Sequence, residues 1–226
     1  MLSIAGLAAC AQASDPLVSD SDRDARIITT ADGPMSSARD PYVSDAPSGL
    51  ATAIVAGGCF WCVEKDFESV DGVISVKSGY SGGRLDNPDY QTVSYSETGH
   101  YEAAEILFDP RVVTYRELID YYWTTVDPTD DGGQFCDRGT SYRTAVFVTP
   151  EQKAEARASL ADIQADKPFN DPIITPILDA VTFYDAEDYH QDYYKKKPVR
   201  YQIYRSSCGR DARLKNLWGD RAKAMP

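Results

Sequence analysis

The sequence predicts an α+β fold. We expect a single domain with a central mixed sheet flanked by helices, a ferredoxin-like core elaborated with long loops. Short apolar or alternating runs typical of strands interleave with stretches that have helical periodicity. The chain has 226 residues, which suits one domain with extra segments. Hydrophobic residues make up 42% of the chain and aromatic residues 11%, so a substantial core can form.

The first predicted elements surround a pair of glycines. Residues 51–56 are an apolar run closed by Gly57 and Gly58, which predicts a buried strand followed by a tight turn. A helix is expected next, over 60–69, because its apolar residues share one face. Strands are then expected over 72–79 and 102–108, with a Gly- and Pro-rich loop over 79–89 between them.

Capping signals and β-branched residues define the second half of the domain. Thr114-x-x-Glu117 is a capping box, which predicts the start of a helix. Thr149-Pro150 predicts another start, because Pro is favoured at the first helical position. A long loop is expected between them, over 127–140. The remaining strands are expected over 143–148, 173–183 and 200–204, and the remaining helices over 187–197 and 211–218.

The charge of the chain argues against nucleic-acid binding. The formal net charge is −12, whereas nucleic-acid binders use Lys and Arg to neutralise phosphates. The basic run Lys195–Lys197 is interpreted as a solvated helix end. His100 and His190 accompany no metal-ligand pattern, and we interpret both as structural.

The N-terminal residues predict an exported protein. Residues 1–13 are read as a signal or lipoprotein segment, since Leu7-Ala8-Ala9-Cys10 resembles a lipobox and Ala11-Gln12-Ala13 an ordinary cleavage site. A cytosolic, disordered N-terminus is the alternative. Residues 14–50 are rich in Asp, Pro, Gly and Ser, and we expect a disordered acidic linker ahead of a domain over 51–220. Nowhere does an apolar span reach the length of a membrane helix.

The stretch GGCFWCVE carries the most informative cysteines. Cys59 follows two glycines and directly precedes the helix predicted from Phe60. A sulfur at that place faces unpaired backbone N–H groups and the positive end of the helix dipole, which favour a thiolate. Five cysteines are too few for a disulfide scaffold in a chain of this length, so we expect them to do chemistry.

Three functions are compatible with this motif. Cys59 and Cys62 could exchange disulfides as a pair, although Phe and Trp are unusual residues between such cysteines. They could hold half of a zinc site, but Cys136 and Cys208 do not form a second C-x-x-C. Alternatively, Cys59 is a nucleophile, and the intervening aromatic residues form an apolar wall for a small nonpolar group.

Several further segments favour the third function. The chain contains the segments GYSGG (79–83), NPDY (87–90), GHYE (99–102), DRGTSYR (137–143), AEDYHQ (186–191) and CGRD (208–211). Together with GCFW, they resemble the A-type peptide methionine sulfoxide reductases in order and spacing, over residues 52–219. The resemblance implies an enzyme that reduces the S epimer of methionine sulfoxide, free or in oxidised proteins.

The resemblance also implies roles for individual residues. Cys59 would attack the sulfoxide sulfur, and a sulfenic acid would form on it. Phe60 and Trp61 would hold the substrate methyl group.

Four polar residues would act on the sulfoxide oxygen or lie beside it. Glu102 would protonate the oxygen, so we expect a buried carboxyl group with a raised pKa. Tyr90 and Tyr142 would donate hydrogen bonds to the oxygen, and Asp137 would lie at the same site.

A second thiol must resolve the sulfenic acid. The family usually uses a cysteine near the C-terminus, which favours Cys208. Cys62 and Cys136 stand where many members have Gly and Asn, and we keep both as relay or alternative resolving residues. The resemblance further implies a thioredoxin-like protein as electron donor, and no metal or organic cofactor. We expect a monomer located in the periplasm or cell envelope, with a lipid anchor on Cys10, or alternatively in the cytoplasm.

Overall fold

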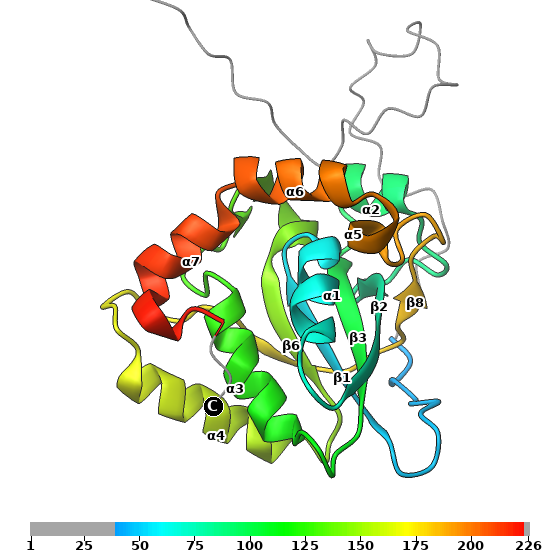
Figure 1. Cartoon of the computed structure of the whole chain (residues 1–226). Coiled ribbons are helices and arrows are strands. Elements are labelled where there is room, and N and C mark those ends of the chain that lie inside the picture. Colours follow the sequence, from blue (N-terminus) through cyan, green and yellow to red (C-terminus); the bar gives the residue numbers. More distant parts are fainter. Residues whose placement is uncertain (1–38, 224–226) are drawn as a thin grey trace, which may run out of the picture.

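A six-stranded mixed sheet forms the centre of the computed structural model, which describes residues 39–223 (Figure 1). The strands lie in the order β7-β6-β1-β3-β2-β8. Their bounds are β1 Ala51–Gly57, β2 Val73–Ser81, β3 Tyr101–Phe108, β6 Thr144–Val148, β7 Ile177–Asp179 and β8 Tyr184–Asp185. β6 and β7 are parallel, whereas the other pairs are antiparallel. The predicted domain with a central mixed sheet is confirmed.

Helices pack on the sheet and against one another (Figure 1). Their bounds are α1 Phe60–Glu68, α2 Tyr90–Tyr95, α3 Tyr115–Thr125, α4 Lys153–Asp166, α5 Tyr193–Lys196, α6 Pro198–Ser207 and α7 Arg210–Trp218. Phe67, Leu118 and Ile106 belong to the main core cluster, which lies between α1, α3 and one face of the sheet. β1 is buried along its length beyond Ala51, because both faces of the sheet are covered.

A segment that precedes the sheet lies on its other face. The Tyr42 amide donates to the carbonyl oxygen of Ala180 at 3.1 Å, and Pro41 forms an isolated bridge with Val181. The Tyr42 hydroxyl donates to the carboxylate of Glu105 on β3. The chain is therefore held against the domain from residue 39 onward, earlier than the start expected at residue 51. The remainder of the predicted linker and the predicted leader lie outside the described residues.

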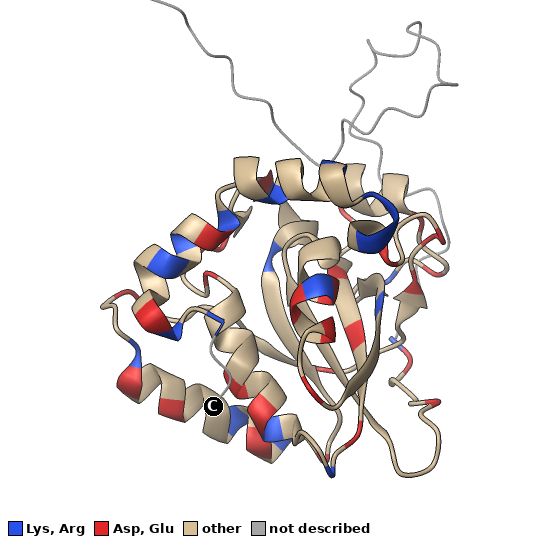
Figure 2. Ribbon diagram, in the orientation of Figure 1, with Lys and Arg blue, Asp and Glu red and all other residues tan. Residues whose placement is uncertain are grey.

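The capping box at the start of α3 is confirmed. The Thr114 hydroxyl oxygen accepts from the amide of Glu117, whose carboxylate accepts in return from the Thr114 amide. Acidic and basic residues are interspersed over the helices (Figure 2), and Lys195–Lys197 are exposed at the end of α5. None of the helices in residues 39–223 is long and apolar enough to cross a membrane.

The predictions for residues 187–204 are largely wrong. Residues 188–192 of the predicted helix 187–197 form turns, and only α5 is helical. The predicted strand 200–204 is part of α6, which begins with Pro198 at its first position. β-branched and aromatic residues suggested a strand, but Tyr201 and Arg205 are buried at a helical spacing. Packing of this face therefore overrides local β propensity.

Other differences concern short elements. α2 follows the loop expected over 79–89, and the loop 127–140 contains a hairpin of β4 Gly133–Gln134 and β5 Asp137–Arg138. The strand predicted over 173–183 is reduced to β7, with β8 beginning only after it. α4 begins at Lys153 rather than at Pro150. Elements of two or three residues carry too little periodicity to be recognised in a sequence.

Candidate active site

The turn between β1 and α1, which we call the cysteine turn (Gly57–Cys59), places Cys59 at the start of a helix. Cys59 is the N-cap residue of α1 and is 1% exposed. Gly58 has a φ of +78°, and a Cβ there would lie 2.5 Å from Cβ of Gln134, so only Gly fits without displacement. The structure thus places the sulfur of Cys59 at a helix N-terminus, as the sequence predicts.

Cys62 lies one helical turn after Cys59 and contacts it. The thiol of Cys62 donates a hydrogen bond to the Cys59 sulfur, and this bond together with burial raises the pKa of Cys62 well above its usual value. Neither residue is in a disulfide. Cys62 therefore keeps its proton near neutral pH and favours negative charge on Cys59.

Glu102 brings a buried carboxyl group to the same helix start. Its side chain is 1% exposed, and its Oε2 accepts from the Phe60 amide at 3.0 Å. Burial raises the pKa of Glu102 well above its usual value, against the opposing hydrogen bonds from Phe60 and Tyr142. Negative charge on Asp137 raises it further. Glu102 is thus a carboxylic acid near neutral pH, with a proton to donate.

Phe60 and Trp61 belong to a buried aromatic cluster that also contains both cysteines of the motif. The Trp61 indole stacks on the ring of Tyr193, with centroids 3.7 Å apart and planes inclined by 6°. The Tyr204 ring meets the indole edge-on at 6.0 Å. The indole is therefore fixed by residues from α5 and α6, more than 130 positions away in the sequence.

His190 fixes the indole through a hydrogen bond. The indole N–H of Trp61 donates to His190 Nδ1 at 3.0 Å, so a neutral imidazole carries its proton on Nε2. Burial lowers the pKa of His190 to about 4, which keeps the ring neutral at pH 7. The nearest carboxylate oxygen is Glu187 Oε2, 3.9 Å from Nε2. The interpretation of His190 as merely structural missed this link to the aromatic wall.

The two tyrosines predicted to bind oxygen lie close to this cluster. The Tyr90 amide donates to Glu187 at 2.9 Å, and the Tyr90 ring lies 4.5 Å from the His190 ring. Tyr142, in a 3₁₀ turn, is 8% exposed and donates a hydrogen bond to Glu102. Both tyrosines therefore accompany the acid, the cysteine turn and the aromatic wall.

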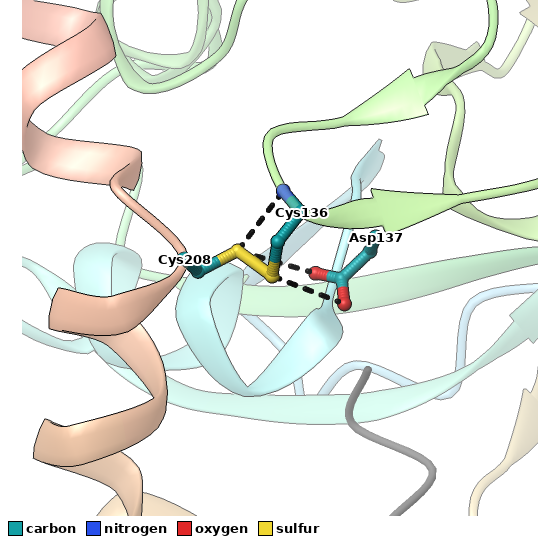
Figure 3. Close-up of side chains that lie close together, drawn as sticks. All are labelled: Cys136, Asp137 and Cys208. Atoms are coloured by element: carbon teal, nitrogen blue, oxygen red, sulfur yellow. Dashed lines mark hydrogen bonds between the residues drawn. A yellow bond between two sulfur atoms is a disulfide. The ribbon is translucent and has the colours of Figure 1, made fainter. Parts of the chain in front are cut away.

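The other two cysteines of the domain form a disulfide (Figure 3). Cys136 lies in the β4–β5 hairpin, and Cys208 is the C-cap residue of α6. The Cys136 amide donates to the Cys208 sulfur at 3.1 Å. The Asp137 oxygens lie 3.7 and 4.0 Å from the sulfurs of Cys136 and Cys208, contacts that can become hydrogen bonds only when the cysteines are thiols.

Asp137 connects this disulfide to the rest of the site. Its carboxylate accepts a hydrogen bond from the hydroxyl of Tyr204, whose ring contacts Trp61. Its charge also acts on Glu102. The structure thus brings together every site residue that the sequence predicted, and adds Glu187, His190, Tyr193 and Tyr204. The last four lie in the segment 186–204, where AEDYHQ was noted without a role and the secondary structure was misread.

The cysteines are not arranged as one cluster of four thiolates. Within residues 39–223, a group of ligand atoms close enough to hold an ion contains Cys136, Asp137 and Cys208, but neither Cys59 nor Cys62. Cys136 and Cys208 are joined to each other. A four-thiolate zinc site therefore does not fit this arrangement.

The chain is similar in sequence to known methionine sulfoxide reductases. Residues 51–222 match the family model described as peptide methionine sulfoxide reductase. Over 168 residues, the chain is 54% identical to a reductase of that name from Caulobacter vibrioides and 50% identical to one from Bacillus licheniformis. These alignments cover 74% of this chain and 85% and 93% of the relatives.

Solved structures resemble the chain as well. The reduced form of Mxr1 from Saccharomyces cerevisiae is similar with a TM-score of 0.62 and 32% identity, over 67% of this chain and 88% of that one. Methionine sulfoxide reductase A of Corynebacterium diphtheriae is similar with a TM-score of 0.58 and 30% identity, over 68% and 77%.

Proposed function

Since the chain belongs to the A-type peptide methionine sulfoxide reductases, and so reduces methionine sulfoxide to methionine, we propose that Cys59 is its nucleophile and Glu102 its acid. The observation that carries this proposal is the hydrogen bond from the Phe60 amide to Glu102. It holds a buried carboxyl group, whose pKa is raised by burial, next to Cys59, the N-cap residue of α1.

The first step transfers oxygen to the cysteine. The Cys59 thiolate attacks the sulfoxide sulfur, while Glu102 gives its proton to the sulfoxide oxygen and Tyr90 and Tyr142 donate hydrogen bonds to it. The S–O bond of the substrate and the new S–S bond to Cys59 then break as the protonated oxygen passes to the Cys59 sulfur, which becomes a sulfenic acid. The substrate sulfur gains the two electrons that Cys59 loses, and methionine leaves.

Phe60 and Trp61 form the wall for the substrate methyl group in this account. Both rings are buried within the cluster that contains Cys59. A sulfoxide sulfur carries a methyl group, a longer chain and an oxygen. If the methyl group lies on the wall and the oxygen faces Glu102, only one epimer presents its sulfur to Cys59, and the resemblance to the A-type reductases implies that it is the S epimer. Asp137 borders this site and supports Tyr204 behind the wall.

Cys62 resolves the sulfenic acid. Its thiol already contacts the Cys59 sulfur, whereas Cys136 and Cys208 are bonded to each other. Attack of Cys62 forms a Cys59–Cys62 disulfide and releases the oxygen as water. This replaces our first expectation, in which Cys208 resolves directly.

Cys136 and Cys208 form a second redox pair. As thiols, they can reduce the Cys59–Cys62 disulfide by exchange and become a disulfide themselves, with Asp137 as acceptor of a thiol proton. Both cysteines are half-buried, in contrast to Cys59 and Cys62. A thioredoxin-like dithiol protein then reduces the Cys136–Cys208 disulfide. The cycle requires no metal or organic cofactor.

The cellular setting is a proposal from the sequence. We propose export to the periplasm or cell envelope with a lipid on Cys10, which lies outside the described residues, and a monomeric enzyme. Fractionation of cells and mass spectrometry of the N-terminal peptide test the location and the lipid. Light scattering tests the oligomeric state.

The proposed roles are tested with dithiothreitol as reductant. We expect the wild-type chain to convert the S epimer of a methionine sulfoxide peptide and to leave the R epimer unchanged. Cys59→Ser abolishes conversion, whereas Cys10→Ser, the matched control outside the domain, leaves it intact. Full activity of Cys59→Ser, or conversion of the R epimer alone, contradicts the assignment.

A further inference from the structure

Arg210 is a buried arginine that contacts the cysteine turn. Its side chain is 2% exposed and stands at the first position of α7, two residues after Cys208. Its Nη1 donates to the carbonyl oxygen of Gly57 at 3.0 Å, and its Nη2 donates to that of Thr125 at 2.9 Å. The guanidinium thus ties the C-terminal helix to the turn that carries Cys59.

The same guanidinium contacts the hairpin of the second cysteine pair. Its carbon lies 4.6 Å from the ring centroid of Phe135, the residue before Cys136, in a cation–π arrangement. Phe135 has a φ of +56°, which is uncommon for a residue other than Gly. Arg210 therefore contacts the cysteine turn and the β4–β5 hairpin that carries Cys136, and it follows Cys208 by two residues.

The charges around Arg210 do not balance. Arg205, Arg210 and Lys223 share the two carboxylates of Asp66 and Asp211, so three positive charges meet two negative ones. Arg205 has close ion pairs with both carboxylates, at 3.0 and 2.8 Å. Arg210 bonds instead to neutral carbonyl oxygens, and its Nε lies 3.9 Å from Asp66 without a hydrogen-bond partner among residues 39–223.

This positive charge lies within reach of the cysteine pair. Arg210, followed by Arg205, lowers the pKa of Cys62 against the larger effects of its hydrogen bond with Cys59 and of burial. Groups from four other elements act on Cys62 or on the acid beside it: Glu102 on β3, Asp137 on β5, Tyr142 in the 3₁₀ turn and Tyr201 on α6. None of these four groups is a cation.

We propose that Arg210 is a positioning residue that holds the cysteine turn and favours the thiolate of Cys59 through its incompletely balanced positive charge. This inference rests on the proposed role of Cys59. The dipole of α1 and the hydrogen bond from the Cys62 thiol also favour the thiolate of Cys59. The second contribution of Arg210 is mechanical, because the bond to Gly57 fixes the backbone just before the nucleophile.

The test compares two substitutions that change the local charge in opposite directions. Arg210→Gln removes the positive charge, and Asp66→Asn removes a negative one with little change in shape. Thiolate formation is followed by ultraviolet absorbance against pH in the full chain, with Cys59→Ser subtracted. We expect the apparent pKa to rise by about one unit in Arg210→Gln and to fall in Asp66→Asn. At a pH below the pKa, one unit is a tenfold loss of thiolate.

Two further variants separate charge from packing. Arg210→Lys keeps the charge and is expected to titrate like the wild type. Arg213→Gln removes a charge from the same helix, at a half-exposed residue paired with Asp127, and is expected to cause no shift. First-turnover methionine formation by Arg210→Gln should recover as the pH is raised.

A defect in folding alone would move both charge variants in the same direction, which would overturn the proposal. An unshifted titration in folded Arg210→Gln would also overturn the proposal. If Arg210→Gln does not fold, an unshifted titration in Asp66→Asn would overturn it. The titration needs no substrate, so a wild-type chain that titrates as expected but makes no methionine refutes the proposed roles and not this inference.

Discussion

The backbone amide of Phe60 donates a hydrogen bond to the buried carboxyl group of Glu102, with 3.0 Å between the nitrogen and Oε2. This bond joins the start of α1, where Cys59 is the cap, to the central strand β3. It orients the acid and brings it to the nucleophile in a place from which water is excluded. Both the attack by Cys59 and the proton transfer from Glu102 depend on this contact.

Glu102→Gln should abolish proton donation while keeping the shape of the side chain. We expect the rate of methionine formation in the first turnover to fall by about 10²–10⁴, the usual contribution of a positioned acid. Glu105→Gln is the matched control, since Glu105 lies on the same strand and bonds to Tyr42. Equal losses in the two variants would argue against a specific role of Glu102.

The pH dependence of the reaction should report the same group. Because burial raises the pKa of Glu102, its acid form persists at neutral pH and is lost as the pH rises through that value. The first-turnover rate of the wild type should therefore decline on the alkaline side. This decline should be absent in the residual activity of Glu102→Gln, and an identical decline in both would assign it to another group.

His190→Phe should weaken the methyl-binding wall. The substitution keeps a ring but leaves the buried indole N–H of Trp61 without its acceptor, at a cost of about 1–3 kcal/mol. We expect KM for the sulfoxide to rise more than kcat falls, and the preference for methyl over ethyl sulfoxides to decrease. His190→Gln retains an acceptor and should restore part of the preference. Unchanged discrimination in folded His190→Phe would contradict this role.

Glu64 should make the stability of the fold depend on pH. Burial raises the pKa of Glu64 from 4.5 to about 7, against hydrogen bonds from Asp192 and Ser78. A carboxyl group whose pKa is higher in the folded than in the unfolded state stabilises the fold fully at a pH below its unfolded-state pKa. This contribution disappears as the pH rises through the folded-state pKa. The difference in the free energy of unfolding between Glu64→Gln and the wild type should therefore shift in favour of the variant by up to about 3 kcal/mol as the pH is raised from 4 to 8. Urea titrations measure this difference, and parallel pH profiles would refute it.

Thr114→Ala should destabilise the domain without affecting catalysis. The capping box at the start of α3 loses its side-chain acceptor, which costs about 1 kcal/mol. Thermal unfolding measures the loss, and first-turnover rates should equal those of the wild type. A large loss of activity at a temperature where the variant is folded would mean that α3 influences the site in a way not described above.

The sequence was most informative where local signals agree. The strand before Gly57, the helix after Cys59 and the capping box at Thr114 combine periodicity, a turn and a cap in the same place, and all were predicted correctly. The position of Cys59 at a helix N-terminus follows from these local signals alone. The motif itself suggested the aromatic wall, since Phe60 and Trp61 directly follow Cys59. The acid and the tyrosines required the resemblance to a family, because they are far from Cys59 in the sequence.

Residues 186–208 could not be read correctly from local signals. α6 contains β-branched and aromatic residues, and its helical form depends on the burial of Tyr201 and Arg205 against the rest of the domain. The hydrogen bond between Trp61 and His190 spans 129 positions, and the disulfide between Cys136 and Cys208 spans 72. Such pairings depend on the tertiary structure and leave no periodic signal.

In the proposed cycle two cysteine pairs act in sequence, and this order determines how much methionine the reduced enzyme can form. Fully reduced chain is mixed with an excess of the S epimer of a methionine sulfoxide peptide, without reductant. We predict two methionines per chain and two disulfides, Cys59–Cys62 and Cys136–Cys208, with one methionine per chain for Cys136→Ser. A single methionine from the wild type together with a Cys59–Cys208 disulfide would contradict the account and return the resolving role to Cys208.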